Sequence, residues 1–264
     1  MITSIVIPMI IVSGIGVLSG VILSVASIVL ATPVNELQEA VREALPGANC
    51  GACGYAGCDG YAAALAEGDV PLTKCIPGGA DLKDQLAEIL GVQAGDFRPM
   101  GAFVKCGGDC DSEKIKLEYV GCETCHAANQ MFAGPGACTY GCIGFGDCAA
   151  VCEYDAINVV NNVAVVDHDK CVGCSKCIAK CPKNIIELAP IHTVSAVACS
   201  NSDKGARVRE VCSAGCIGCM KCQKACPEEA ITVVNFLAVV DYDKCNGCGL
   251  CAENCPVSCI SVMK

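Results

Sequence analysis

Residues 171–182 read CVGCSKCIAKCP, and residues 245–256 read CNGCGLCAENCP. Each stretch places four cysteines in the spacing C-x2-C-x2-C-x3-C and ends on proline, and the second begins 74 residues after the first. The chain contains 27 cysteines in 264 residues, no tryptophan and only 4% aromatic residues. Because large core side chains are scarce, we expect covalent or metal cross-links through cysteine to stabilise the fold.

Three uses of cysteine compete to explain this pattern. Disulfides are typical of secreted proteins, but the cysteine count is odd and no cleavable signal peptide is convincing. Structural zinc prefers two separated pairs of ligands, and that pattern does not dominate here. The repeated spacing with its final proline is the one by which bacterial ferredoxins bind iron–sulfur clusters. The sequence therefore predicts [4Fe-4S] clusters as cofactors.

Residues 2–31 contain no charged side chain. An uncharged run of this length exceeds the roughly 20 residues that span a bilayer, even with Pro8 near its start. A signal peptide would begin with basic residues and have a shorter apolar core, although residues 29–34, VLATPV, leave cleavage open. We predict a single-pass transmembrane anchor over residues 1–32 in the cell membrane. The cysteine-rich remainder should face the cytoplasm, because cluster thiolates need a reducing compartment.

Residues 33–95 are expected to form a small helical domain. Apolar residues recur at helical spacing over residues 34–45, 58–68 and 81–90. Three closely spaced cysteines precede or begin the second of these stretches, and a fourth follows it. Glycines between the first three would let the loop wrap tightly around a cluster. The predicted ligands of this [4Fe-4S] cluster are Cys50, Cys53, Cys58 and Cys75.

Residues 96–130 form a connecting segment with four further cysteines. Their arrangement fits a further cluster or a zinc site, and it equally fits ordinary buried thiols. The sequence leaves these interpretations open for Cys106, Cys110, Cys122 and Cys125.

The rest of the chain is a duplication, with modules over residues 131–190 and 191–264. Residues 152–174 align with residues 226–248 at the offset of 74 without a gap. In each copy a cysteine precedes two short runs (INVV and VAVV, then ITVV and LAVV) that predict a β-hairpin. We therefore expect an α+β fold with tandem two-cluster ferredoxin-like (βαβ-type) modules, in which the fourth cysteine of each motif binds the other cluster.

The offset of 74 assigns most ligands and reveals one gap. Cys219 of the second copy falls opposite Phe145, so the first copy lacks the middle cysteine of its motif. Cys138 lies just upstream and is the predicted substitute. The four predicted sets are Cys138, Cys142, Cys148 and Cys181; Cys152, Cys171, Cys174 and Cys177; Cys216, Cys219, Cys222 and Cys255; and Cys226, Cys245, Cys248 and Cys251.

A few cysteines stay outside these sets. The offset pairs Cys199 with Cys125, which we interpret as remnants of one ancestral module. Cys212 and Cys259 have no assigned cluster. The sequence thus predicts five clusters and leaves a sixth open.

The composition also excludes several functions. A net charge of −10 argues against a nucleic-acid partner, because no basic field is available to neutralise phosphates. No glycine-rich phosphate loop follows a predicted strand, and the three histidines lie near no acid–base constellation. No catalytic residue is therefore predicted, and we expect the chain to pass single electrons to a partner that binds flavin.

Lysines gather around the cluster motifs, where they could dock an acidic electron carrier or simply offset the charge of the clusters. They are Lys170, Lys176, Lys180, Lys183, Lys221, Lys224 and Lys244.

The order of these motifs resembles the B-subunit family of the Rnf complex over essentially the whole chain. The apolar N-terminal segment precedes CGACGYAGCDGYAAALA at residues 50–66, and GACTYGCIGFGDCAAVC at residues 136–152 opens the tandem motifs. The resemblance implies a subunit of an ion-translocating ferredoxin:NAD+ oxidoreductase in prokaryotic membranes. It implies reduced ferredoxin as electron donor, flavin-containing and other membrane subunits as partners, and Na+ or H+ as the ion that those other subunits move.

One departure and two other functions accompany this resemblance. Glu153 follows Cys152 where the other motifs have proline, which we expect to reduce loop rigidity and to keep the ligand. A related complex that keeps a transcriptional regulator reduced stays open, and neighbouring genes would discriminate it. An adaptor with purely structural metal sites also stays open, and bound zinc would favour it.

Overall fold

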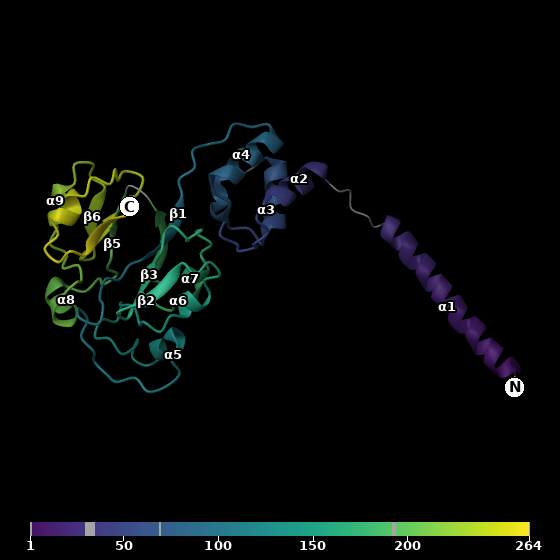
Figure 1. Cartoon of the computed structure of the whole chain (residues 1–264), viewed down its shortest axis with the longest axis horizontal. Helices are drawn as coiled ribbons and strands as arrows, with labels where there is room; N and C mark the ends of the chain where they lie inside the picture. The colour runs from purple at the N-terminus through teal and green to yellow at the C-terminus, as the bar shows by residue number, and fades with distance from the viewer. Residues whose placement is uncertain (1, 30–34, 69, 192–193, 264) are drawn as a thin grey trace.

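The computed structural model describes residues 2–29, 35–68, 70–191 and 194–263. Helix α1, Ile2–Val29, lies at the N-terminal end of the chain (Figure 1), and its side chains are described at residues 7, 9 and 12–26. Among the residues described in this way, no helix is both long and apolar enough to cross a membrane. The anchor over residues 1–32 stays a prediction.

A small helical domain follows α1. Asn35 begins its first helix by accepting the N–H of Leu37 at 3.1 Å, which satisfies a donor that the helix leaves free. Val41, Tyr61 and Leu86 meet in the buried core. The helices that the apolar spacing predicts are thereby confirmed. The elements are α2 Glu36–Ala44, α3 Cys58–Glu67, the 3-10 turns η1 Leu72–Lys74 and η2 Ile76–Gly78, and α4 Gly79–Leu90.

The first ferredoxin-like module has a pair of outer strands around a hairpin. Strand β1, Met100–Val104, pairs antiparallel with β4, Ile186–Pro190. The hairpin consists of β2, Ile157–Val160, and β3, Val163–Val166. Because β1 comes from the segment expected to be a connector, that segment supplies part of the module. The short helices are α5 Cys125–Gln130, α6 Asp147–Ala150 and α7 Lys176–Lys180.

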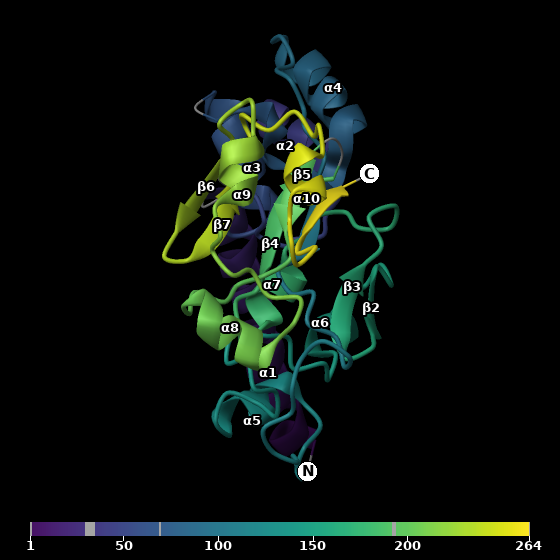
Figure 2. The same ribbon diagram turned by 90° about the vertical axis from the view of Figure 1, so that its left-hand side faces the viewer.

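The second module repeats this arrangement. Strand β5, Val194–Val197, pairs antiparallel with β8, Ile260–Met263. The hairpin consists of β6, Ile231–Val234, and β7, Leu237–Val240. In Figure 2 the two hairpins lie on either side of β4 and β5. The helices are α8 Gly205–Val211, α9 Lys221–Ala225 and α10 Leu250–Glu253.

Both predicted hairpins are confirmed, and their turns explain them. Asn161 and Asn162 have φ values of 49° and 68°, and Asn235 and Phe236 have 49° and 64°. Two consecutive left-handed residues make the type I′ turn, whose twist matches that of the strands it joins. Asparagine tolerates this conformation better than most residues, which accounts for three of the four positions.

The strand register relates the two modules residue by residue. Val104 pairs with Ile186 in the first module, and Val197 pairs with Ile260 in the second. Because Ile186 and Ile260 are 74 residues apart, Val197 is the counterpart of Val104 although these two are 93 residues apart. The first copy therefore has a longer segment between its first strand and its first cysteine motif.

The modules pack against each other along their outer strands. Arg98, just before β1, donates from Nη1 to the carbonyl oxygen of Tyr242 at 3.0 Å. The hydroxyl of Tyr242 in turn donates to Oε1 of Glu187 on β4 at 2.8 Å. Ala189 and Ala196 are fully buried in an apolar cluster that both modules share. These contacts hold the two sets of cysteine motifs next to one another.

Candidate iron–sulfur sites

The first site lies in the helical domain, where the structure brings together Cys50, Cys53, Cys58 and Cys75. Burial raises the pKa of Cys75, and the other three thiols around it raise it further. Asn49 holds the loop in place, because its side-chain oxygen accepts the N–H of Cys58 at 2.8 Å. Gly57, with a φ of 113°, lies so close to Asn49 that a Cβ atom would approach this oxygen to 2.9 Å. The loop thus depends on glycine at this position.

The second site is a cavity in the first module. Burial raises the pKa of Cys177 to about 11, with the thiols of Cys171 and Cys174 adding to the effect. The N–H of Ala102 donates to Sγ of Cys171 at 3.3 Å. The sulfur of a free thiol is only a weak hydrogen-bond acceptor. In iron–sulfur sites, by contrast, N–H groups that point at the sulfurs help to set the reduction potential. The cavity is lined by the predicted set Cys152, Cys171, Cys174 and Cys177.

The third site is a cavity lined by Cys125, Cys142, Cys148 and Cys181. Burial raises the pKa of Cys148 to about 12, and the thiols of the other three cysteines contribute to the rise. Three of these residues belong to one predicted set. Cys138, the predicted fourth member, does not line this cavity, and Cys125 from the connecting segment takes its place.

Two side chains explain why Cys125 reaches the first module's motif. Asp147 of α6 is buried, and its Oδ1 accepts the N–H of Cys125 at 3.0 Å. Phe145, at the position of the missing cysteine, packs against Tyr119 with ring centroids 5.6 Å apart. Both aromatic rings border the apolar cluster that contains Cys125. Phe145, at the position of the missing cysteine, therefore packs against the segment that brings Cys125 to the cavity.

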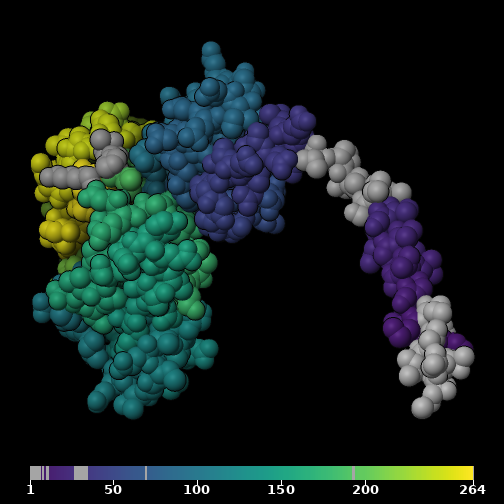
Figure 3. Space-filling model, turned by 45° about the vertical axis from the view of Figure 1, so that its right-hand side comes forward, coloured from purple at the N-terminus to yellow at the C-terminus, as the bar shows by residue number. Residues whose placement is uncertain are grey.

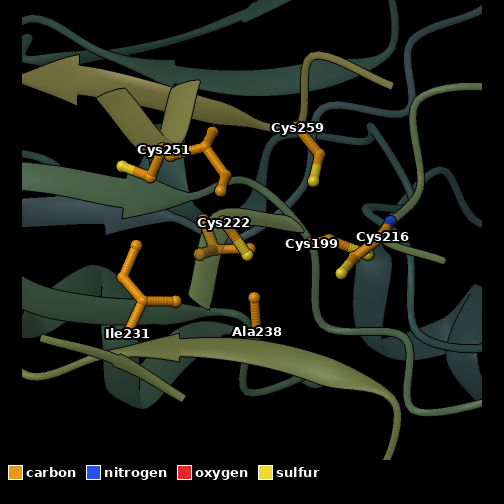
Figure 4. Close-up of a cluster of buried hydrophobic side chains, with 9 residues drawn as sticks. Cys199, Cys216, Cys222, Ile231, Ala238, Cys251 and Cys259 are labelled. Atoms are coloured by element: carbon orange, nitrogen blue, oxygen red, sulfur yellow. The ribbon is translucent and has the colours of Figure 1, made fainter. Parts of the chain in front are cut away.

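The second module repeats the two sites of the first. Burial raises the pKa of Cys222 to about 11, and its thiol neighbours are Cys216, Cys219 and Cys255, the other members of one predicted set. In the other predicted set, Sγ of Cys245 accepts the N–H of Ser195 at 3.4 Å. Figure 4 shows Cys222 and Cys251 in the interior of this module near Ile231 and Ala238, with Cys216 next to Cys199. The remaining members, Cys226 and Cys248, are partly buried and exposed, respectively.

Backbone donors to sulfur recur at equivalent positions in both modules. In each of the three pairs, a backbone N–H donates to a cysteine Sγ at 3.3 to 3.4 Å. The bonds in the first module run from Ala102 to Cys171, from Ala156 to Cys152 and from Cys142 to Cys106. Their counterparts in the second module run from Ser195 to Cys245, from Ala230 to Cys226 and from Cys216 to Cys199. Iron binds cysteine as the thiolate, and an N–H group that points at the sulfur stabilises that anionic form. The donor set therefore fits [4Fe-4S] clusters.

A single metal ion is the alternative occupant of these cysteine sites. In the described part of the chain, no three His, Cys, Asp or Glu side chains are placed to share one metal ion. A four-iron cluster spreads its thiolates widely, because each binds a different iron atom.

The four cysteines of the connecting segment do not form a site together. Cys106 and Cys125 line different cavities, and Cys110 and Cys122 are exposed. The structure also pairs Cys199 with Cys106 and not with Cys125. Cys106 and Cys199 each follow an outer strand by two residues, and each accepts an N–H from an equivalent cysteine at 3.3 Å.

The comparisons with known proteins agree with these sites. Residues 45–77 match an Fe-S cluster family, residues 164–187 a 4Fe-4S binding domain, and residues 206–262 a 4Fe-4S dicluster domain. The chain is 41% identical over 262 residues to the B subunit of the Na(+)-translocating ferredoxin:NAD(+) oxidoreductase complex of Acetobacterium woodii, an alignment that covers 99% of this chain and 79% of that one. The chain belongs to the B-subunit family of ion-translocating oxidoreductase complexes.

Two further relatives support this membership. The chain is 40% identical over 233 residues to the B subunit of the Proton-translocating ferredoxin:NAD(+) oxidoreductase complex of Clostridium ljungdahlii, covering 88% of this chain and 82% of that one. It is 37% identical over 234 residues to the B subunit of the Ion-translocating oxidoreductase complex of Methanosarcina acetivorans, covering 88% and 89%. As a member of this Rnf subunit family, the chain is an iron–sulfur electron-transfer subunit of a multi-subunit oxidoreductase.

The first two sites of this B-subunit family member lie next to each other. Ile76, adjacent to the ligand candidate Cys75, packs against Gly173 in the loop between Cys171 and Cys174. A Cβ atom at Gly173 would lie 2.6 Å from Cγ2 of Ile76. Figure 3 shows the helical domain, in blue, against the rest of the cysteine-rich part. The cysteine motifs thus form a continuous series from the helical domain into the first module.

Several of the lysines near the motifs have structural partners. The ammonium of Lys183 donates to the carbonyl oxygens of Ala133 at 2.6 Å and Thr139 at 2.7 Å, and so ties down the loop before Cys138. Lys176 pairs with Glu153 at 2.6 Å. Lys170 pairs with Asp167 at 3.5 Å and Lys244 with Asp241 at 3.6 Å. The other exposed lysines around the motifs are Lys180, Lys221 and Lys224.

Proposed function

We propose that this subunit accepts electrons from reduced ferredoxin and relays them to a flavin-containing subunit of the same complex, which reduces NAD+. The names of the Acetobacterium and Clostridium relatives, each from a ferredoxin:NAD(+) oxidoreductase complex, support the two end points. The observation that carries the proposal is the contact of Ile76 with Gly173, because it joins the cysteines of the helical domain to the motifs of the first module. One-electron carriers need such short steps between neighbouring sites.

The chain's own residues supply ligands, hydrogen bonds and shelter from water. Bound clusters would supply reversible one-electron transfer at potentials set by charge, hydrogen bonding to sulfur and exposure. Ala102 and Ser195 donate N–H groups to ligand sulfurs of their modules, and the hairpins exclude solvent from the cavities. Donors at sulfur stabilise the reduced, more negative state, so they raise the potential.

Two of the five ligand sets that we propose for [4Fe-4S] clusters line cavities of the first module. The five sets are the predicted ones except that Cys125 replaces Cys138. The sets are Cys50, Cys53, Cys58 and Cys75; Cys152, Cys171, Cys174 and Cys177; Cys125, Cys142, Cys148 and Cys181; Cys216, Cys219, Cys222 and Cys255; and Cys226, Cys245, Cys248 and Cys251.

The membrane role that we propose rests on the N-terminal segment. The 28 residues of α1 carry no charged side chain, which supports a single-pass anchor with the domains after residue 32 on the cytoplasmic side. A span without ionisable groups offers no ion path, so other subunits would move the ion. The relatives' names differ between Na+ and protons, and similarity therefore leaves the coupling ion to experiment.

The test is ferredoxin-dependent NAD+ reduction in anaerobic inverted membrane vesicles, with this subunit present and selectively depleted. We expect the rate to disappear on depletion and to return when the purified chain is added back. A chain carrying Cys171→Ser and Cys174→Ser is the matched control and should not restore the rate. An unchanged rate in depleted vesicles would overturn the proposal.

A further inference from the structure

A third cavity lies where the two modules meet, and its cysteines are not needed by the five clusters above. The cysteines that line it are Cys106, Cys138, Cys199 and Cys212.

These four cysteines form two pairs of equivalent positions, and each pair has one member in each module. Cys106 and Cys199 occupy the second position after β1 and β5, as the strand register shows. Cys138 and Cys212 are related by the offset of 74 that also relates the ferredoxin motifs. Each module thus contributes the same two positions, and the two contributions face one space.

The sulfurs flank this space closely. A Cβ atom at Gly108 would lie 3.1 Å from Sγ of Cys212 and 3.8 Å from Sγ of Cys106. Cys138 and Cys199 line the same space. A four-iron cluster suits four such cysteines, because each thiolate binds a different iron atom.

Buried amide groups are aimed at these sulfurs. Asn201, only 2% exposed, donates its backbone N–H to Sγ of Cys199 and its side-chain Nδ2 to Sγ of Cys138, both at 3.4 Å. Burying a polar side chain is costly unless its hydrogen bonds are made, and here a sulfur takes one of them. Such bonds are strong when the acceptor is an anionic thiolate.

Glu113 ties two of the ligand candidates together. Its backbone forms an antiparallel bridge with Cys212, and its carboxylate accepts the N–H of Cys138 at 3.0 Å. The side chain is buried at the junction of the modules. One residue of the connecting segment therefore positions a cysteine from each module.

We propose that Cys106, Cys138, Cys199 and Cys212 bind a sixth [4Fe-4S] cluster, which bridges the two ferredoxin-like modules. The N–H groups of Cys142 and Cys216, ligands proposed for the flanking clusters, donate to sulfurs of this site, so it adjoins one cluster of each module. One electron would enter from one module and the same electron would leave to the other. This relay role rests on the proposed function, whereas the presence of the cluster does not.

The test is the iron and acid-labile sulfide content of the full chain, purified anaerobically, together with its EPR spin quantitation after reduction. The variant Cys199→Ser/Cys212→Ser avoids every residue of the other five sets. We expect it to lose about four iron and four sulfide per chain and one cluster's worth of EPR intensity. The matched control Cys110→Ser/Cys122→Ser removes two exposed thiols and should lose none. Full iron content in the first variant would overturn the proposal.

A variant that misfolds would lose far more iron than one cluster, so a milder change provides a second measurement. Cys212→Ser alone should leave a cluster short of one thiolate, which oxidation converts to a [3Fe-4S] form with its own EPR signal. Absence of that signal in a chain that keeps its remaining clusters contradicts the assignment. One zinc ion per chain, lost together with Cys199 and Cys212 while iron stays constant, would also overturn it. None of these measurements involves ferredoxin or NAD+, so failure here and failure of the proposed function are separable.

Discussion

The buried carboxylate of Asp147 accepts the backbone N–H of Cys125 at 3.0 Å and that of His126 at 3.2 Å. These are the first two N–H groups of helix α5, which have no partner within the helix. Asp147 itself lies on α6, one residue before Cys148. A single side chain therefore holds two cysteines from separate segments at one cavity.

Replacing Asp147 should loosen this cavity. We expect Asp147→Ala to lower the free energy of unfolding by about 2 kcal/mol, because two hydrogen bonds to a charged acceptor are lost and their donors stay buried. The third site should then lose iron first when the chain is exposed to a chelator. Chelator-dependent iron release, followed against time, measures this effect.

Asp147→Asn provides the control for charge. Its amide oxygen can still accept the N–H of Cys125, so we expect iron release between the wild-type rate and that of Asp147→Ala. Equal rates in all three chains would show that Asp147 does not position Cys125.

A pair of double variants identifies the fourth ligand of the third site. If Cys125 and Cys148 bind the same cluster, Cys125→Ser/Cys148→Ser should lose no more iron than the worse of its single variants. Cys138→Ser/Cys148→Ser should instead lose the sum of its single variants, because these residues would serve different clusters. The reverse pattern would return Cys138 to the set that the sequence predicts.

Local signals explain why much of the fold was predictable. The period of the apolar residues indicated α2, α3 and α4, and the short β-branched runs indicated both hairpins, because these patterns act over neighbouring residues. The Asn161 and Asn162 turn belongs to the same class of signal. The pairing of β1 with β4 was not predicted, since their sequences are far apart and only the folded chain brings them together.

The ligand assignment shows where a constant repeat offset fails. The offset placed Phe145 opposite Cys219 correctly, and so located the missing ligand. Proximity in sequence then indicates Cys138, whereas the cavity is lined by Cys125, which Asp147 holds in place, and the choice between them stays a prediction. The same offset paired Cys199 with Cys125, because the longer segment after β1 shifts the true counterpart, Cys106, by an amount that no local pattern reveals.

Phe145→Cys should restore the ligand that the first copy lacks. In the Cys125→Ser background, the new thiol would occupy the position of Cys219 in the second module, so we expect the third site to regain its iron. Phe145→Leu in the same background is the matched control, since it removes the aromatic ring without adding a thiol. Iron content and EPR intensity of the two chains decide the outcome, and equal values would contradict the structural equivalence of the modules.

Gly173 tests the contact between the helical domain and the first module. Its φ is +66°, and a Cβ atom there would lie 2.6 Å from both Cγ2 of Ile76 and the carbonyl oxygen of Met100. Gly249 has a similar φ of +79°, but its nearest neighbour would lie at 3.4 Å. In both alanine variants the left-handed backbone conformation costs about 1–2 kcal/mol. Only in Gly173→Ala does the new Cβ atom also collide with neighbouring atoms.

We therefore expect Gly173→Ala to separate the helical domain from the module and to slow electron transfer between their clusters at least tenfold. Gly249→Ala should lower stability without changing that rate. Rapid-mixing reduction of the full chain by a one-electron donor, followed by freeze-quench EPR, measures the transfer. Equal rates in the two variants would show that the contact of Ile76 with Gly173 does not set the distance between the first two sites.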